Sequence, residues 1–142
     1  MTADLVTVKV SRSYAHAPEK VFDAWLTPAQ AAKFLFATPQ GQMVKAEVDA
    51  RVGGAFLFTD RRDGDDIEHV GKYLEIDRPR RLVFTFSVPA FSREETTVIV
   101  EIAPSGSGSE LTLTHQRVLP DYAEQTNAGW NMILDGLARA LG

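Results

Sequence analysis

The middle of the chain constrains the fold most strongly. From Met43 to His115, short β-rich runs alternate with turn residues, and no helix-length segment separates them. Strands joined by short turns are antiparallel, because a parallel pair needs a long crossover connection. The turn residues fall at Gly53-Gly54, Asp63-Gly64, Asp77 to Arg80, Pro89 and Ser105 to Gly108. The pattern predicts six consecutive strands, at residues 44–48, 55–59, 67–76, 82–88, 96–102 and 111–115.

The segment before this meander predicts one strand and two short helices. Val6, Val8 and Val10 alternate with polar residues, which is typical of a strand with one buried face. Residues 17–26 place Val21, Phe22, Trp25 and Leu26 on one helical stripe, behind a proline that a first turn tolerates. Residues 27–30 match a capping box, in which the Thr27 hydroxyl accepts from a backbone N–H and Gln30 reaches back.

A long amphipathic helix is expected at the end of the chain, over residues 121–141. Its apolar stripe recurs at helical spacing and consists of Trp130, Ile133, Leu134, Leu137 and Leu141. With a first strand, two short helices, six strands and this helix, the predicted class is α+β with a seven-stranded antiparallel sheet. One long helix must then cover one face of that sheet, and a ligand cavity can form between the two.

Composition excludes several classes of function. The 142 residues fit one domain, 1–142, and without cysteine there is no disulfide, thiolate nucleophile or Cys-ligated metal. His16, His69 and His115 are too scattered for a recognisable metal set, so no metal or other cofactor is expected. A net charge of −4 without a concentrated basic face argues against nucleic acid. Because the sequence has neither a signal peptide nor the roughly 18-residue apolar run of a membrane span, a cytoplasmic protein without membrane insertion is expected.

Ordered motifs along the chain resemble a known family. Asp49-Ala50-Arg51-Val52-Gly53-Gly54-Ala55-Phe56 resembles the Asp-x-Arg-x-Gly-Gly-x-aromatic segment of the family named after the activator of Hsp90 ATPase. That family lies within the START-like or Bet v 1-like superfamily, also called SRPBCC. Further matching segments follow the family's order, at residues 17–25, 71–76, 79–85, 111–115 and 129–137.

The resemblance implies a START-like domain over 1–142 with a helix-grip fold, in which the sheet curves around the C-terminal helix and leaves a cavity. Eukaryotic co-chaperones of this family carry a further N-terminal domain that supplies most of the chaperone contact. These 142 residues do not contain it, so contact with Hsp90 stays open as a role but direct stimulation is not expected. Phe34-Leu35-Phe36 stands where many relatives carry Trp, which predicts a wider pocket mouth.

The leading hypothesis is non-enzymatic binding of an apolar or aromatic small molecule between the sheet and the last helix. Strand alternation turns large apolar side chains, with few polar ones, toward that helix. The residues expected to bind the ligand are Trp25, Phe34, Phe56, Phe58, Tyr73, Phe84, Phe86, His115, Trp130 and Leu134.

Two alternatives stay open at the level of sequence. A polyketide cyclase or hydrolase would use His115, Tyr73 or Asp49 as acid or base, and would need an interior titratable group with a shifted pKa. A regulator of a chaperone or stress pathway would instead need an exposed apolar patch of roughly several hundred Å². Homodimer formation is also left open.

Overall fold

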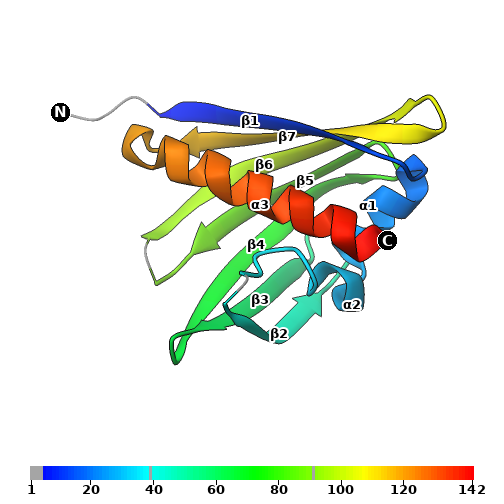
Figure 1. Ribbon diagram of the computed structural model, residues 1–142. Helices are drawn as coiled ribbons and strands as arrows, with labels where there is room; N and C mark the ends of the chain where they lie inside the picture. Colours follow the sequence, from blue (N-terminus) through cyan, green and yellow to red (C-terminus); the bar gives the residue numbers. More distant parts are fainter. Residues whose placement is uncertain (1–4, 39, 91) are drawn as a thin grey trace.

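The computed structural model describes residues 5–38, 40–90 and 92–142, with Ser92 and Arg93 described by backbone alone. Seven strands form one open antiparallel sheet in the order β1-β7-β6-β5-β4-β3-β2 (Figure 1). This confirms the predicted α+β class and the meander. The strands are β1 (Val6–Tyr14), β2 (Gln42–Val48), β3 (Ala55–Arg62), β4 (Asp65–Asp77), β5 (Arg81–Val88), β6 (Ser92–Ser105) and β7 (Gly108–Val118).

The helices follow the predicted order. Two short ones come after β1, namely α1 (Pro18–Leu26) and α2 (Pro28–Ala31). A 3₁₀ turn, η1 (Pro120–Tyr122), precedes the long α3 (Ala123–Leu141), so the α-helix begins two residues later than expected. The predicted capping box is wrong, because the Thr27 hydroxyl donates backward to the carbonyl of Asp23, 2.8 Å away, and caps no N–H of α2.

Polar contacts from β1 and α1 hold α3 over the sheet. The Tyr14 hydroxyl donates to the Leu134 carbonyl at 2.8 Å in the interior. At the surface Arg12 pairs with Asp135 at 3.1 Å. Near the end of the chain the Lys20 ammonium donates to the Leu141 carbonyl at 3.1 Å. These bonds tie α3 to the first strand and the first helix, so the helix crosses the concave face of the sheet (Figure 1).

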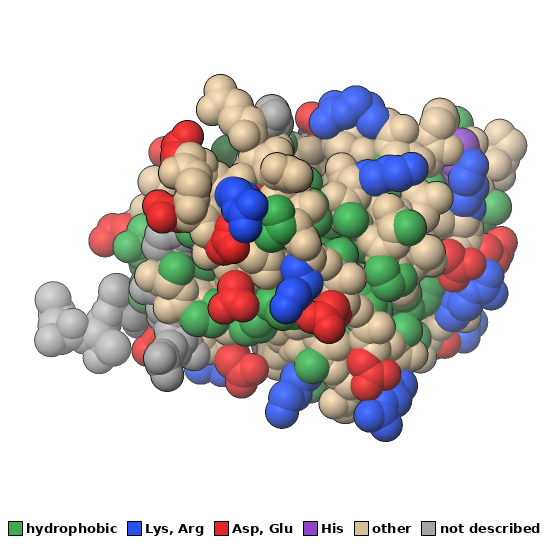
Figure 2. All heavy atoms as spheres, turned by 90° about the horizontal axis from the view of Figure 1, so that it is seen from below, with side chains coloured by type: hydrophobic (Ala, Val, Ile, Leu, Met, Phe, Trp, Pro, Cys, Tyr) green, Lys and Arg blue, Asp and Glu red, His purple; other side chains and the backbone are tan. Residues whose placement is uncertain are grey.

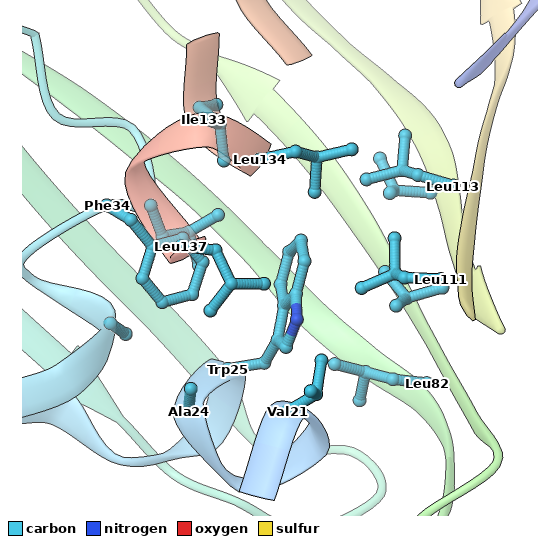
Figure 3. Packing of buried hydrophobic residues seen from close by; sticks show 14 of the residues in the cluster. Val21, Ala24, Trp25, Phe34, Leu82, Leu111, Leu113, Ile133, Leu134 and Leu137 are labelled. Atoms are coloured by element: carbon cyan, nitrogen blue, oxygen red, sulfur yellow. The ribbon is translucent and has the colours of Figure 1, made fainter. Parts of the chain in front are cut away.

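The concave face carries the core, as strand alternation predicts. Most inward residues of β3, β5, β6 and β7 are buried, whereas Arg62, Phe86 and Thr96 are partly exposed. The buried side chains around Trp25 are mostly aliphatic. They come from α1, α3 and the strands, and they converge on the Trp25 ring (Figure 3). We call this set the Trp25 cluster: Val21, Ala24, Trp25, Phe34, Leu82, Leu111, Leu113, Ile133, Leu134 and Leu137.

The outer surface is mixed in character. On the face drawn in Figure 2, basic and acidic side chains alternate, and the hydrophobic ones appear in small groups. Among the described residues no helix is both long and apolar enough to cross a bilayer.

Candidate ligand site

A second group of interior side chains is made of rings that touch one another. They come from the segment after α2, from β3, β4, β5 and β7, and from α3. We call this set the Phe36 cluster: Phe36, Phe56, Phe58, His69, Tyr73, Phe84, Phe86, His115 and Trp130. Seven of these nine residues were predicted to bind the ligand, and the sheet brings those seven together.

Phe36 lies at the centre of this cluster. Its ring is nearly parallel to those of His69 and Phe86, with both centroid distances 4.8 Å. Phe58 and Trp130 meet it closer to edge-on, at 5.7 and 6.1 Å. The side chains of Phe34, Leu35 and Phe36 are all buried, so this segment packs into the interior, and the wider pocket mouth stays a prediction.

The backbone of Phe36 is strained. Its φ is 60°, in the left-handed region, where a side chain with a bulky ring is rare. Such a conformation costs roughly 1–2 kcal/mol in a residue that carries a Cβ. The contacts of the Phe36 ring with the surrounding rings must therefore offset this cost and stabilise the strained backbone conformation.

A chain of hydrogen bonds fixes His115 in one neutral form. The Trp130 indole N–H donates to His115 Nδ1 at 2.9 Å, so Nδ1 is an acceptor. His115 Nε2 lies 2.7 Å from the Thr96 hydroxyl oxygen, and the Thr96 O–H donates to the Phe86 carbonyl at 3.0 Å. Nε2 must then carry the ring proton. Burial lowers the pKa of His115 to about 4, so the ring is neutral near pH 7.

His69 is held in a similar way on β4. Its Nδ1 lies 3.2 Å from the Phe58 carbonyl, to which it donates, and Nε2 accepts from the Arg62 guanidinium at 3.4 Å. Burial is the main cause that lowers the pKa of His69 to about 4, opposed by the hydrogen bond to Phe58. Both ring nitrogens of both histidines are therefore engaged, and neither ring offers a free base or proton donor.

Arg62 connects the Phe36 cluster to the surface. Its Nε donates to Asp60 Oδ2 at 2.8 Å, and Nη2 donates to the Phe36 carbonyl at 3.2 Å. Asp60 is fully buried, and its Oδ2 also accepts from the Thr38 hydroxyl at 2.9 Å. Asp60 Oδ1 has no hydrogen-bond partner among the described residues. Arg62 itself is about one-third exposed, so one side of this network reaches solvent.

Two hollows of about 360 Å³ each open on the surface of the described residues. One lies between the start of β1 and the start of α3, beside Lys9 and Asn127. The other is lined by Thr38, Gln40, Gly41, Arg62 and Asp63. Because Arg62 also contacts Phe36 and His69, the second hollow adjoins the Phe36 cluster.

The remaining predicted ligand residues lie elsewhere in the interior. Trp25, Phe34 and Leu134 belong to the Trp25 cluster, where the rings of Trp25 and Phe34 meet edge-on at 5.4 Å. The indole N–H of Trp25 is buried and has no partner among the described residues. Asp49, an alternative acid or base, is exposed and pairs with Arg51 at the surface at 2.8 Å. Tyr73 is buried, and that burial raises the pKa of its hydroxyl above the ordinary value.

Sequence reasoning placed Phe36 only at the expected pocket mouth, and it missed His69 and the Asp60–Arg62 pair as parts of this site. His69 shares strand parity with Tyr73, and Asp60 and Arg62 continue the inward alternation of Phe56 and Phe58. Those signals were present in the sequence, but β3 was expected to end at Thr59, three residues before its observed end. For Phe36 nothing in the sequence signals a positive φ, because turns of that kind normally carry Gly or Asn.

In the described ranges no group of three or more His, Cys, Asp or Glu could hold a metal ion. An interior rich in rings, with a few paired polar groups and a surface hollow beside it, offers the apolar contacts and few polar groups that sites for apolar molecules use. The fold and this interior define the class of protein as an open antiparallel sheet packed around a C-terminal helix, in keeping with the START-like superfamily.

The family model for Activator of Hsp90 ATPase homolog 1-like protein matches residues 15–142, and the chain belongs to that family. Protein CV1439 of Chromobacterium violaceum is 27% identical, with a TM-score of 0.86 over 95% of this chain and 96% of that one. Mll3558 of Rhizobium loti is 24% identical, with a TM-score of 0.83 over 99% of each chain. An AHSA1-like protein of Aeromonas hydrophila is 24% identical, with a TM-score of 0.81 over 96% of this chain and 92% of that one. A search of curated proteins finds no match.

Proposed function

We propose that this protein binds an apolar or aromatic small molecule between the sheet and α3, without catalysing a reaction. The observation that carries the proposal is the Phe36 cluster, in which nine ring-bearing residues meet on the concave face of the sheet. A solid core needs no such concentration of rings, and aliphatic side chains fill the neighbouring part of the same interior.

The polar groups of the cluster support a passive role. An acid–base catalyst needs a group that can exchange a proton with its substrate. His115 and His69 have the shifted pKa values that a catalytic role would predict. Their nitrogens, however, bond to Trp130, Thr96, Phe58 and Arg62. These bonds explain both histidines as positioned structural groups, so the binding hypothesis accounts for the site with fewer assumptions than an enzyme.

No observation favours a protein-interaction role as strongly. Large hydrophobic side chains are exposed at Leu5, Val44, Val52, Leu74, Leu119 and Tyr122. Leu5, Leu119 and Tyr122 lie near one end of the sheet, where Val6 pairs with Val118 and the Tyr122 N–H donates to the Leu119 carbonyl, and the other three lie on separate elements or turns. Contact with Hsp90, homodimer formation, a stress-response role and a cytoplasmic location stay predictions from the sequence.

A two-dimensional amide NMR titration tests the proposal. Fatty acids, flavonoids, polyketides and sterols form the panel, and we expect saturable shifts for one class at Phe86, His115 and residues 129–137. These positions lie on three elements that share the Phe36 cluster, so a ligand there must move them together. If the shifts at all three positions follow the same binding curve, they report one site with one dissociation constant.

A pair of variants locates the binding. Phe86→Leu removes a wall of the Phe36 cluster at a half-buried position, and we expect it to weaken binding at least about tenfold, the equivalent of 1.4 kcal/mol. Leu74→Ala is the control, because Leu74 is half exposed and lies outside the cluster. Equal affinities in wild type, Phe86→Leu and Leu74→Ala, or no saturable shift with any compound, would overturn the proposal.

A further inference from the structure

The Phe36 ring occupies a slot whose walls are themselves rings. His69 and Phe86 lie side by side against one face of it, tilted from it by only 8° and 5°, since their own centroids are 6.1 Å apart while each lies 4.8 Å from that of Phe36. Phe58 and Trp130 stand at 61° to it and close the sides of the slot. Walls of this kind fit any flat aromatic ring by offset stacking and edge-to-face contact. The slot is therefore specific for the shape of a planar ring and not for the chain position that supplies it.

The backbone conformation of Phe36 is unfavourable, in contrast to the contacts of its ring. With φ at 60° the main chain is held in a conformation that a phenylalanine leaves readily once the ring is free. The Arg62 guanidinium donates to the Phe36 carbonyl and also lines the second surface hollow. That hollow thus adjoins the main chain that carries the ring, and gives a ligand a place to approach.

We propose that Phe36 is a displaceable stand-in for a planar aromatic ligand, whose ring stacks on His69 and Phe86, beside Trp130, when the Phe36 ring leaves this slot. This inference rests on the proposed function and narrows its ligand class. The histidine nitrogens in the slot walls are already paired. A hydroxyl or carboxylate on the side of the ring that faces the two histidines would find no free ring nitrogen there, so the ligand presents a flat ring without polar substituents on that side.

The free energy needed to move the Phe36 ring out of the slot lowers the affinity of the wild-type protein for the ligand. If the state with the Phe36 ring outside the slot is populated at about 10% or less, the apparent dissociation constant is raised at least about tenfold above the intrinsic one. Removing the ring removes this penalty. Glycine at position 36 also accepts a φ of 60°, so Phe36→Gly empties the slot and relieves the strained backbone together.

The test uses two probes of similar size and different shape. Fluorobenzene is flat and fluorocyclohexane is not, and both are followed by ¹⁹F NMR titration against the full chain. For Phe36→Gly we expect a dissociation constant for fluorobenzene at least about tenfold below that of wild type, and weaker binding of fluorocyclohexane. Phe36→Leu fills the slot with a non-planar side chain, and its fluorobenzene affinity should fall between the two.

Phe34→Gly is the matched control. Phe34 is a second buried phenylalanine of the same segment, but its ring neighbour is Trp25 and the walls around it are aliphatic. The space left there has no stack of parallel rings, so we expect no preference for the flat probe. A preference in Phe34→Gly equal to that in Phe36→Gly would show that any cavity in this core selects flat rings, and would overturn the inference.

Other outcomes separate the inference from the proposed function. If wild type binds a compound of the NMR panel but Phe36→Gly and Phe36→Leu gain no affinity for fluorobenzene, the inference fails and the proposed function stands. If Phe36→Gly does not fold, the comparison between Phe36→Leu and wild type decides. If wild type binds neither the probes nor the panel while Phe36→Gly binds fluorobenzene, Phe36 is a fixed plug, and both the displacement and the proposed function are wrong.

Discussion

The Trp25 cluster and the Phe36 cluster are two parts of one interior, and they are built differently. Both lie between the sheet and α3, and each contains a tryptophan that is nearly fully buried. The Trp25 cluster is mainly aliphatic and holds no hydrogen-bonded side-chain pair. In the Phe36 cluster the Trp130 N–H donates to His115, whereas the Trp25 N–H has no partner among the described residues. The contrast separates a mainly aliphatic region from a region of hydrogen-bonded rings, in which we propose that the ligand binds.

Position along the same elements decides which cluster a residue joins. On β7, Leu111 and Leu113 belong to the Trp25 cluster, and His115, two residues on, belongs to the Phe36 cluster. On α3 the change occurs between Trp130 and Ile133. One strand and one helix thus carry the mainly aliphatic part and the candidate binding part side by side.

Acid should destabilise the Phe36 cluster most strongly. His69 and His115 have pKa values lowered by burial to about 4 in the folded protein, against about 6.5 when unfolded. The unfolded state then binds more protons between these values, so the histidines lower the stability as the pH drops from about 6.5 to about 4, and their contribution changes little further below. Each histidine contributes at most about 3 kcal/mol to this loss, at 1.36 kcal/mol per pKa unit.

Urea unfolding at a series of pH values measures this slope. His115→Asn keeps an acceptor for the Trp130 N–H while removing one titrating group, so it should remove about half of the slope. A slope unchanged in that variant would mean that His115 contributes nothing to the acid-induced loss of stability, and the proposed role of its buried neutral ring would be wrong.

Removing an aliphatic side chain should show that the Trp25 cluster is the stabilising part. Leu137 is fully buried there, and Leu137→Ala is expected to cost about 2–5 kcal/mol, since the lost contacts and the cavity both count. Thermal and urea unfolding measure the change, with Leu119→Ala, at an exposed position, as control. A loss below about 1 kcal/mol would indicate slack packing, and would move the candidate cavity into the Trp25 cluster.

The fold could be predicted from the sequence more completely than the site. Turn residues such as Asp63-Gly64 and the alternation of Phe56 and Phe58 are local signals. Because the connections between strands are short, consecutive strands pair with each other and form an antiparallel meander. The helical stripe of Trp130, Leu134 and Leu137 likewise specified which face of α3 is buried. Each of these features depends on residues close together in the sequence.

The site depends on contacts between distant residues, which periodicity does not encode. Parity placed Phe86 and His115 on the inner face, but the Trp130–His115–Thr96 chain joins three elements through side-chain rotamers. Periodicity also does not show which buried residues contact one another. The predicted ligand residues therefore included Trp25 and Phe34, which lie in the Trp25 cluster, together with Phe86. Phe36 lies outside any helix or strand, and the position of its ring depends on its own strained backbone conformation.

The two tryptophans offer a direct comparison of the clusters. Trp130→Phe removes a hydrogen bond and leaves the buried His115 Nδ1 without a donor, which should cost about 1–3 kcal/mol. It should also raise the pKa of His115 toward the ordinary value, since Nδ1 is then free to take a proton. Trp25→Phe removes no hydrogen bond between described residues, so it should cost less. Urea unfolding and histidine NMR titration measure both effects, and equal costs would argue that the Trp130 bond adds nothing.

The smallest expected effect concerns the contacts beside Phe36. Thr38→Val keeps the shape of the side chain but removes the hydroxyl that donates to the buried Asp60 carboxylate, which should cost about 1 kcal/mol. Thr38→Ser keeps the hydroxyl and is the matched control. Because Asp60 also holds Arg62, and Arg62 holds the Phe36 carbonyl, hydrogen exchange should quicken in Thr38→Val at the amides of Phe36 and Ala37 before those of α3. Uniform acceleration across both clusters would mean that these contacts stabilise the whole interior and do not act locally on Phe36.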